Sequence, residues 1–423
     1  MSSRLIWSIS VLARRIWFRA TLFSLAAVAT ALLAIVVTPY IPADLSTKIG
    51  ADSVDNILGI IASSMLTVTT FSLSTMVSAY SAATTNVTPR ATRLVMEDST
   101  TQNVLATFVG SFLFSLVGII ALTTGAYGEQ GRLVLFVVTI AVIVLIVVTL
   151  LRWIDHLSRL GRVTETTRRV EEATLDAVKA WRKSPNLGGR ALERDSREPR
   201  TDDTPFFADE IGYVQHVDAE ALAKIADESK CELVIVAIPG KLASPVQPLG
   251  WLRGAVGEDV LDRAGACFSI GDVRSFDQDP RFGASVLTEI ASRALSPAVN
   301  DPGTAIDVIS RAMRILCAWH DANSEAPDEI LYPRLHVATL SAADLFDDLF
   351  TPIARDGAGL VEVGLRLQKT LAMLSKLSEE FHANAVRHSK EALDRAAAVL
   401  RIEADMERLQ AAAAAITADH KLS

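Results

Sequence analysis

Cysteine is scarce in this chain, with three in 423 residues, at positions 231, 267 and 317. The three lie far apart, and no cysteine or histidine has the spacing of a zinc site. They fall in the part of the chain that we assign below to the cytoplasm, where disulfides rarely persist. We therefore expect buried, small apolar side chains rather than metal ligands or cross-links.

Sequence motifs of catalysis are lacking as well. There is no glycine-rich phosphate loop ending in Lys-Ser/Thr, no paired-histidine zinc helix and no Gly-x-Ser-x-Gly elbow. The acidic cluster of Asp344, Asp347 and Asp348 has no further ligands nearby in sequence, so we interpret it as a solvated helix face. With a net charge of −8, the chain also lacks a basic surface for nucleic acid. The sequence predicts no enzyme, no metal and no cofactor.

Charge is missing from four long runs, although half of all residues are hydrophobic. The uncharged runs are Ala20–Ala43, Asn56–Pro89, Ser99–Gly128 and Leu133–Leu151. Each reaches the length of about 20 residues that a helix needs to cross a hydrocarbon core. Since backbone groups in lipid must bond within the segment, these runs predict four transmembrane helices and the lipid bilayer as a partner.

Basic residues gather outside the first and last runs. The arginines in question are Arg4, Arg14, Arg15 and Arg19 before the first run, and Arg152, Arg159, Arg162, Arg168 and Arg169 after the fourth. An even number of crossings with arginine-rich flanks predicts a bacterial inner-membrane protein with both termini in the cytoplasm. The first run is longer than a typical signal core and no clear cleavage site follows it, so we expect an uncleaved anchor.

The remainder of the chain reads as an ordinary globular sequence. The expected fold class is an α-helical membrane protein with four transmembrane helices and a mixed, mainly α cytoplasmic domain that contains a small β-rich subdomain. The predicted regions are a four-span domain (1–155), a cytoplasmic helix (156–183), a flexible linker (184–206), a small β-rich subdomain (207–278) and a helical cytoplasmic domain (279–423).

Helix starts are marked by capping residues in the cytoplasmic part. Asp218 is a good N-cap, and Asp279-Pro280, Asp301-Pro302 and Thr351-Pro352 each read as an N-cap followed by proline at the first helical position. The second of these pairs ends a distinctive stretch that we predict to be a structural turn between two helices. Its marking residues are Ser296, Pro297, Asn300, Asp301 and Pro302. A free helix N-terminus can hold an anion, but capping accounts for Asp301 and Pro302.

The second uncharged run is unusual in its hydroxyl content, because twelve of the 23 residues from Ser63 to Thr85 are Ser or Thr. On an α-helix, seven of them fall within about 80° of arc and extend over about 33 Å. These seven residues, which we call the hydroxyl stripe, are Ser63, Thr67, Thr70, Ser74, Ser78, Ser81 and Thr85.

Two interpretations of the hydroxyl stripe remain open. Hydroxyls let helices approach closely and can bond their own backbone, and small residues on the third run, such as Gly110 and Gly118, offer partners. Alternatively, stripes from several copies line a path for an ion or a small solute. Arg90 and Arg93 would then stand at a cytoplasmic mouth, where the acidic pair Glu97-Asp98 could cancel their charge.

Several motifs along the chain occur together in one known family. They are Thr88-Pro89-Arg90 after the hydroxyl-rich run, Gly212-Tyr213-Val214, Gly271-Asp272, Asp279-Pro280-x-Phe282-Gly283 and Leu295-Ser296-Pro297-x-x-Asn300-Asp301-Pro302. The chain resembles the bacterial predicted-membrane-protein family catalogued as domain of unknown function twenty-two fifty-four. The resemblance implies residence in a membrane and assigns no activity. Similar proteins often carry glutamines near the end of the second run, where this chain has Ser81-Ala82-Ala83-Thr84.

Taken together, these patterns favour a homo-oligomeric channel or pore-type transport protein whose cytoplasmic domain gates or assembles the path. The alternative is a membrane-anchored sensory or scaffolding protein, in which the hydroxyl stripe is a packing face and the soluble domain binds a partner or ligand. Accessibility of the stripe to water separates the two.

Overall fold

The computed structural model describes residues 7, 12, 16–37, 51–125, 129–192, 199–254, 257–324 and 330–418. Over these residues the chain is mostly helical, with a mixed sheet region, and the coarse prediction of fold class is confirmed. The chain divides into two compact units. We call Ser8–Thr166 the apolar unit, and Thr167–Ser423 together with Met1–Trp7 the mixed unit.

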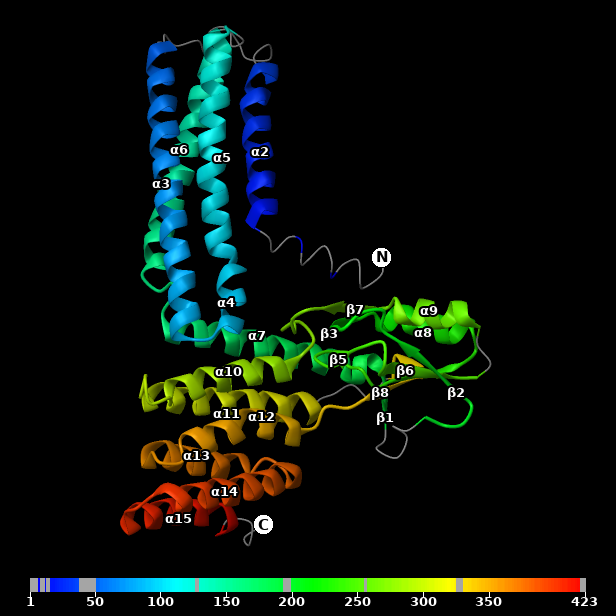
Figure 1. Cartoon of the computed structure of the whole chain (residues 1–423). Helices are drawn as coiled ribbons and strands as arrows, with labels where there is room; N and C mark the ends of the chain where they lie inside the picture. The colour runs from blue at the N-terminus through cyan, green and yellow to red at the C-terminus, as the bar shows by residue number, and fades with distance from the viewer. Residues whose placement is uncertain are drawn as a thin grey trace. The chain divides into compact units, whose positions relative to one another are not determined.

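The apolar unit consists of helices that run alongside one another (Figure 1). They are α2 (Ile16–Val37), α3 (Ala51–Asn86), the short α4 (Pro89–Met96), α5 (Ser99–Thr123) and α6 (Glu129–Leu157). Helix α5 packs against α2, α3 and α6, and it has the largest buried share of the long helices. The core of this unit is therefore organised around α5.

Three helices of the apolar unit are long and apolar enough to cross a membrane, at Ser53–Thr85, Ser99–Thr123 and Gly131–Leu157. They correspond to the second, third and fourth uncharged runs. In the first run, the apolar helical segment that the structure describes is Trp17–Leu33, which is shorter.

Small residues on α5 let its neighbours approach closely. A Cβ atom added at Gly110 would lie 3.3 Å from the carbonyl oxygen of Phe23 on α2, and one added at Gly118 would lie 3.1 Å from Leu58 Cδ1 on α3. Both contacts are tight for a side chain. The close packing expected of these glycines thus involves Leu58 of α3, which does not belong to the hydroxyl stripe.

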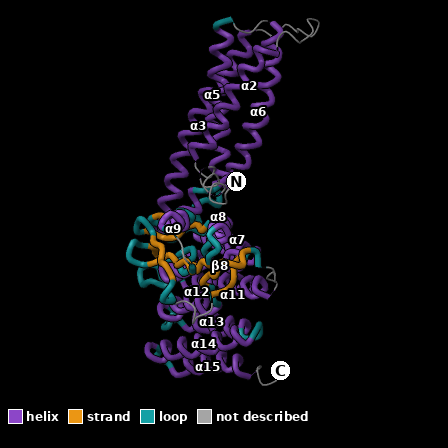
Figure 2. The backbone as a smooth tube through the Cα atoms, turned by 90° about the vertical axis from the view of Figure 1, so that its right-hand side faces the viewer, coloured by secondary structure: helices purple, strands orange, loops and turns teal. Residues whose placement is uncertain are grey.

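The mixed unit contains two sheets (Figure 2). The five-stranded sheet has the order β1-β8-β4-β6-β2, with β1, β8 and β4 parallel and β6 antiparallel to both β4 and β2. The three-stranded antiparallel sheet has the order β5-β3-β7. The strands are β1 (Gly189–Leu192), β2 (Asp203–Phe207), β3 (Gly212–Val217), β4 (Glu232–Ile235), β5 (Leu242–Ala243), β6 (Pro248–Arg253), β7 (Phe268–Gly271) and β8 (Tyr332–Ala338).

One face of the five-stranded sheet forms the main core of this unit. Leu233, Leu252 and Leu335 are fully buried there, together with Leu222 of α8 (Ala219–Glu228) and Phe268 of β7. The short helix α9 (Glu258–Gly265) contacts β2. Alternating apolar residues in β4, β6 and β8 supply this face, as expected for strands with one buried side.

The prediction of a flexible linker at residues 184–206 is wrong for most of the residues that the structure describes there. Pro185–Gly188 form a 3-10 turn (η3), and Gly189–Leu192 and Asp203–Phe207 are strands β1 and β2. Both strands pair at the sheet edges, β1 with β8 and β2 with β6, and these long-range pairings are invisible to local composition. For the same reason, the predicted helical region 279–423 also contributes strand β8.

Helices make up the rest of the mixed unit, and α10 to α15 stack in successive layers (Figure 1). They are α7 (Val163–Lys183, shared with the apolar unit at its start), α10 (Pro280–Ala294), α11 (Pro302–Ser324), α12 (Ala342–Asp356), α13 (Val361–Leu374), α14 (Glu379–Val399) and α15 (Glu403–Ala418). Helix α7 begins after a turn in which Gly161 has a φ of +79°. The helix predicted over 156–183 is therefore interrupted between Leu157 and Val163.

The capping predictions had different outcomes. Asp218 and Asp279 cap α8 and α10, as expected. The predicted start at Thr351-Pro352 is wrong, because Pro352 lies inside α12. That helix begins earlier, where Ser341 and Asp344 form a reciprocal capping box.

Gly250 in β6 has the least room for a side chain among the glycines of the five-stranded sheet. A Cβ at this position would lie 2.0 Å from the backbone oxygen of Val234, which cannot move without disturbing the ladder between β4 and β6. We expect Gly250→Ala to lower the free energy of unfolding of the mixed unit by about 1–3 kcal/mol. Chemical denaturation of the full chain in detergent measures this. Gly359→Ala, where no atom lies within 4 Å of the added Cβ, is the control and should change stability by less than about 0.5 kcal/mol.

Candidate functional site on helix α3

Helix α3 packs on its neighbours through one narrow face. Its buried residues are Val54, Leu58, Ile61, Met65, Ser72, Met76, Ala83 and Val87, the last just beyond its end. At 100° per residue, the first seven fall within about 60° of arc. The packing face is apolar apart from Ser72, whose Oγ accepts a hydrogen bond of 3.0 Å from Trp153 Nε1 of α6.

All seven residues of the hydroxyl stripe are exposed in the protomer. The centre of the stripe lies about 170° around α3 from the centre of the packing face. Exposed apolar side chains flank the stripe, among them Leu66, Phe71, Leu73 and Val77. The stripe is therefore not sealed against helices of its own subunit, and it forms the outermost surface of α3.

Four of the seven hydroxyl groups of the stripe have backbone acceptors. Those of Ser63, Thr67, Thr70 and Ser78 donate to carbonyl oxygens one turn earlier on α3, over 2.8–3.1 Å. Such bonds satisfy the hydroxyl proton and leave the oxygen lone pairs free to accept from water or from a neighbouring chain. The stripe can therefore face either water or a neighbouring chain with little loss of hydrogen-bonding free energy.

The chain turns sharply at the end of α3. Thr88 caps α4, Pro89 occupies its first turn, and Arg90 is exposed. Arg93 Nε lies 2.7 Å from Glu97 Oε1, so the charge of this arginine is offset within α4 and its C-cap.

Asp98, the second acid after α4, is paired as well. Its carboxylate caps α5 by accepting from Thr101 N at 2.9 Å, and it lies 2.8 Å from His156 Nε2 of α6. Of the two arginines predicted to stand at a cytoplasmic mouth, Arg90 is exposed and Arg93 is paired with Glu97, while the second acid, Asp98, is paired with His156.

The predicted turn between α10 and α11 contains one left-handed residue. Asn300 has a φ of +50°, and Asp301 N donates to Ala294 O at 2.8 Å, which closes the turn. Asp301 then accepts from Thr304 N (3.1 Å) and Thr304 Oγ1 (2.6 Å). These bonds hold the pKa of Asp301 below its ordinary value. Ser296 Oγ donates to Arg293 O at 2.7 Å, and Pro297 is exposed.

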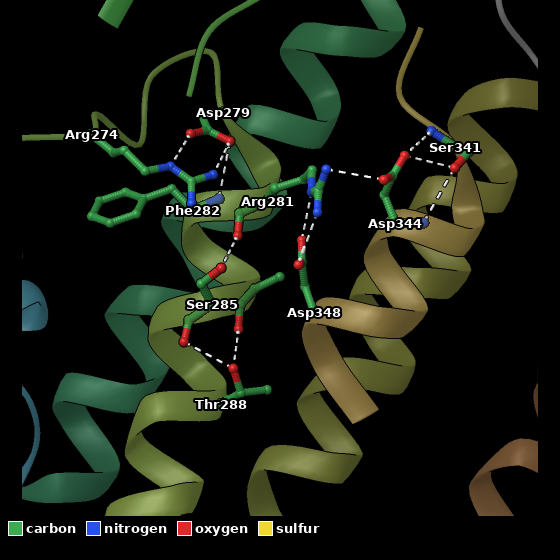
Figure 3. A network of polar contacts seen from close by, with 10 residues as sticks. Arg274, Asp279, Arg281, Phe282, Ser285, Thr288, Ser341, Asp344 and Asp348 are labelled. Atoms are coloured by element: carbon green, nitrogen blue, oxygen red, sulfur yellow. Dashed lines mark hydrogen bonds and ion pairs between the residues drawn. The ribbon is translucent and has the colours of Figure 1, made fainter. Parts of the chain in front are cut away.

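Ion pairs between helices organise the mixed unit, and sequence reasoning missed them. Arg281 of α10 bonds Asp348 through Nε (2.6 Å) and Nη2 (3.0 Å), and Asp344 through Nη1 (3.0 Å), as Figure 3 shows. The spacing of four residues places both carboxylates on one face of α12. Burial raises the pKa of Asp344, but its bond to Ser341 and the charge of Arg281 outweigh burial and hold it below its ordinary value. The acidic cluster of α12 is thus partly ion-paired rather than simply solvated.

A second buried cluster joins α7 to α11. Glu171 bonds Arg311 and Arg314, and its side chain and that of Arg311 are each 8% exposed. No sequence signal could have found this cluster, because 140 residues separate Glu171 from Arg311. Among the described residues, no group of three or more side chains is placed to hold a metal ion.

Comparison with known proteins places the chain in a family. The family described as "Predicted membrane protein (DUF2254)" matches residues 13–373. Uncharacterized proteins of Mycobacterium tuberculosis and Mycobacterium bovis are 29% identical over 283 residues, which is 65% of this chain. The chain spans 53% of the length of these curated relatives, and no solved structure matches it. With its three long apolar helices and a match over most of its length, the chain belongs to this family of predicted membrane proteins.

Proposed function

We propose that this protein is a homo-oligomeric, pore-type transport protein of the bacterial inner membrane and not an enzyme. In this proposal four helices span the bilayer, both termini lie in the cytoplasm, and the mixed unit assembles or gates the path. The hydroxyl stripes of neighbouring copies face a shared route for an ion or a small solute.

The observation that carries the proposal is the position of the stripe opposite the packing face of α3. Lipid tails offer no partner for the oxygen lone pairs that the seven aligned hydroxyls leave free, and membrane proteins direct polar groups inward, toward a bundle or a water-filled path. The helices of the same subunit leave the stripe exposed. A second copy of the chain is therefore the surface that fits it, and flanking Phe71 and Val77 supply apolar contacts beside it.

Helix α2 supports the count of four spans. Its 22 residues would extend about 33 Å, which matches the hydrocarbon core of a bilayer. Four spans place the arginine-rich segments before α2 and after α6 on the same side of the membrane, which is the arrangement that the positive-inside rule favours.

Cysteine accessibility tests the proposal directly. In a background with Cys231, Cys267 and Cys317 replaced by serine, single cysteines at positions 67, 70, 74 and 78 should react with a membrane-impermeant thiol reagent. Cysteines at Met65 and Met76, on the packing face, are the controls and should stay unlabelled. If none of the four stripe positions is labelled, while a cysteine in an exposed loop is labelled normally, the result would contradict a water-filled path.

Ion flux gives the second test. The double variant Thr70→Leu/Ser74→Leu narrows the route by two bulky apolar side chains, and we expect flux into liposomes to fall at least tenfold. Ser64→Leu, an exposed hydroxyl position beside the stripe, is the matched control and should conduct like the parent protein. Parent liposomes as tight as empty ones, across several ions and voltages, would reject the channel.

The alternative is a membrane-anchored sensory or scaffolding protein whose mixed unit binds a partner or ligand. The backbone bonds of Ser63, Thr67 and Thr70 favour it, because hydroxyls satisfied in this way fit a dry interface between copies. In that case disulfide cross-links should form between copies at stripe positions, while aqueous reagents fail to reach them.

A further inference from the structure

The second face of the five-stranded sheet differs from the core face in its charge. Leu233, Leu252 and Leu335 point into the core, so the alternate residues of β4, β6 and β8 point to the opposite side. The pairing register brings these alternate residues into rows across the sheet. Arg190, His336, Val234 and the buried Trp251 form one row, and Glu232, Arg253 and Asp203 form the next.

A cavity of about 800 Å³ lies against this charged face. Its lining includes four basic side chains, Lys183, Arg190, Arg200 and Arg253, and one acidic side chain, Glu232. The volume falls in the range of pockets that hold small molecules and cofactors. The cavity therefore has the size of a ligand site and an excess of positive charge.

Arg253 is nearly buried and belongs to the lining of the cavity. Its side chain is 11% exposed, and Nε lies 3.3 Å from Asp203 Oδ2. Its Nη2 atom is sealed from solvent and has no hydrogen-bond partner among the described residues. Because Nη2 is sealed from the cavity as well, Arg253 contributes its positive charge to the cavity and not this donor.

His336 shows that the arginines act at one place. Burial lowers the pKa of His336, and the positive charges of Arg253, Arg190 and Arg200 add to this effect, while Glu232 opposes it. Arg190, Arg200 and Arg253 therefore line the same cavity as His336 and act on it electrostatically. Asp203, paired with Arg253, and Glu232, 3.7 Å from His336, offset part of this positive charge, and a bound anion would offset the remainder.

The turn η3 at the rim of the cavity has strained backbone. Asn186 and Leu187 have φ of +49° and +58°, and Gly188 follows with +84°. Two consecutive non-glycine residues in the left-handed region are rare, and such strain gathers at ligand sites. Asn186 and Gly188 line the cavity.

We infer that this cavity binds a small phosphorylated molecule, with Arg190 and Arg200 bonding its phosphate oxygens and Arg253 adding positive charge beside them. Guanidinium groups match phosphate oxygens in pairs, and several of them around one pocket select a polyanion over a neutral ligand. The inference concerns the mixed unit alone and holds whether or not the apolar unit conducts.

Binding to the full-length protein in detergent tests the inference, with pyrophosphate, ATP and glycerol 3-phosphate as probes. We expect saturable binding by calorimetry, and a rise in the thermal unfolding midpoint, for at least one of them. Binding of ATP or pyrophosphate alone identifies a polyphosphate ligand, whereas binding of glycerol 3-phosphate alone identifies a phosphomonoester. Absence of saturable binding by all three overturns the inference.

The double variant Arg190→Gln/Arg200→Gln should weaken that binding at least tenfold, since each lost charged contact has a large effect. Both side chains are exposed, so the variant should unfold at the midpoint of the parent protein without ligand. Arg366→Gln/Arg401→Gln, with the same charge change at exposed positions outside the cavity lining, is the control and should bind within twofold of the parent. If both double variants lost the same amount of ligand affinity, the loss would come from the change in net charge, and the proposed site would be refuted. Arg200→Gln alone serves if the double variant misfolds.

Discussion

Replacing Glu171 by glutamine is expected to lower the free energy of unfolding of the mixed unit by about 3–5 kcal/mol. Among the described residues, Glu171 is the carboxylate that bonds both Arg311 and Arg314, and its oxygen atoms lie 2.5–3.0 Å from the Nε and Nη2 atoms of Arg314. Glutamine keeps the shape but not the charge. Arg311, with 8% of its side chain exposed, would then keep the half-exposed Asp307 as its acidic partner among the described residues. An uncompensated buried charge is among the largest single penalties known for a substitution.

The neighbouring Glu172 provides a matched control. It is 56% exposed and pairs with Arg168 on the same helix, so Glu172→Gln should change stability by less than about 1 kcal/mol. Urea titration followed by tryptophan fluorescence measures both variants, because Trp181 and Trp319 lie 5.7 Å apart on α7 and α11. Similar costs for the two variants would show that the buried cluster contributes no more than a surface pair.

The same cluster predicts how stability depends on pH. Burial raises the pKa of Glu171, but the bonds and charges of Arg314 and Arg311 outweigh burial and hold it below its ordinary value of 4.5. A carboxyl group whose pKa is depressed on folding adds stability above its unfolded pKa and loses it as pH falls through the folded pKa. The contribution of Glu171 should therefore be complete above about pH 4.5 and decline below it. The free energy of unfolding of Glu171→Gln should lack the part of the decline at low pH that comes from Glu171.

Local patterns in the sequence predicted the long helices but not the direction in which they face. The uncharged runs gave the spans of α3, α5 and α6, because length and lack of charge are properties of one segment. The hydroxyl stripe of α3 was also visible as a period of 3.6 residues. The exposure of the stripe was not visible in the sequence. It follows from the packing of Leu58 and Met65 against α5 and α6, which turns the stripe away from these helices.

Sheet edges and clusters of distant charges escaped prediction for a different reason. Strands β1 and β2 lie in a stretch rich in proline, glycine and charge, which locally resembles a linker. They are strands because β8 and β6 supply hydrogen bonds from residues far along the chain. The basic cavity has the same origin, because its arginines stand on strands that only the sheet register brings together.

The two Asp-Pro caps of the mixed unit have the same sequence signature but differ in burial, and burial should determine how much each contributes to stability. Asp279-Pro280 and Asp301-Pro302 carry the same signature, and each aspartate accepts from the backbone N–H three residues later. Asp279 is 2% exposed and accepts two further bonds, of 2.8 and 2.9 Å, from Arg274, which also lies over the Phe282 ring (Figure 3). Asp301 is exposed.

Asp279→Ala should therefore lower the free energy of unfolding by about 3–5 kcal/mol, because it removes a cap and leaves Arg274 beside an apolar ring without its acid. Asp301→Ala removes a cap alone and should cost about 1 kcal/mol. Asp279→Asn keeps a capping oxygen and loses the charge, so its cost should fall between the two. Urea denaturation of the three full-length variants in detergent gives this order. Equal costs for the two alanine variants would mean that Arg274 adds nothing to the cap, and that an Asp-Pro signature alone predicts its own contribution to stability.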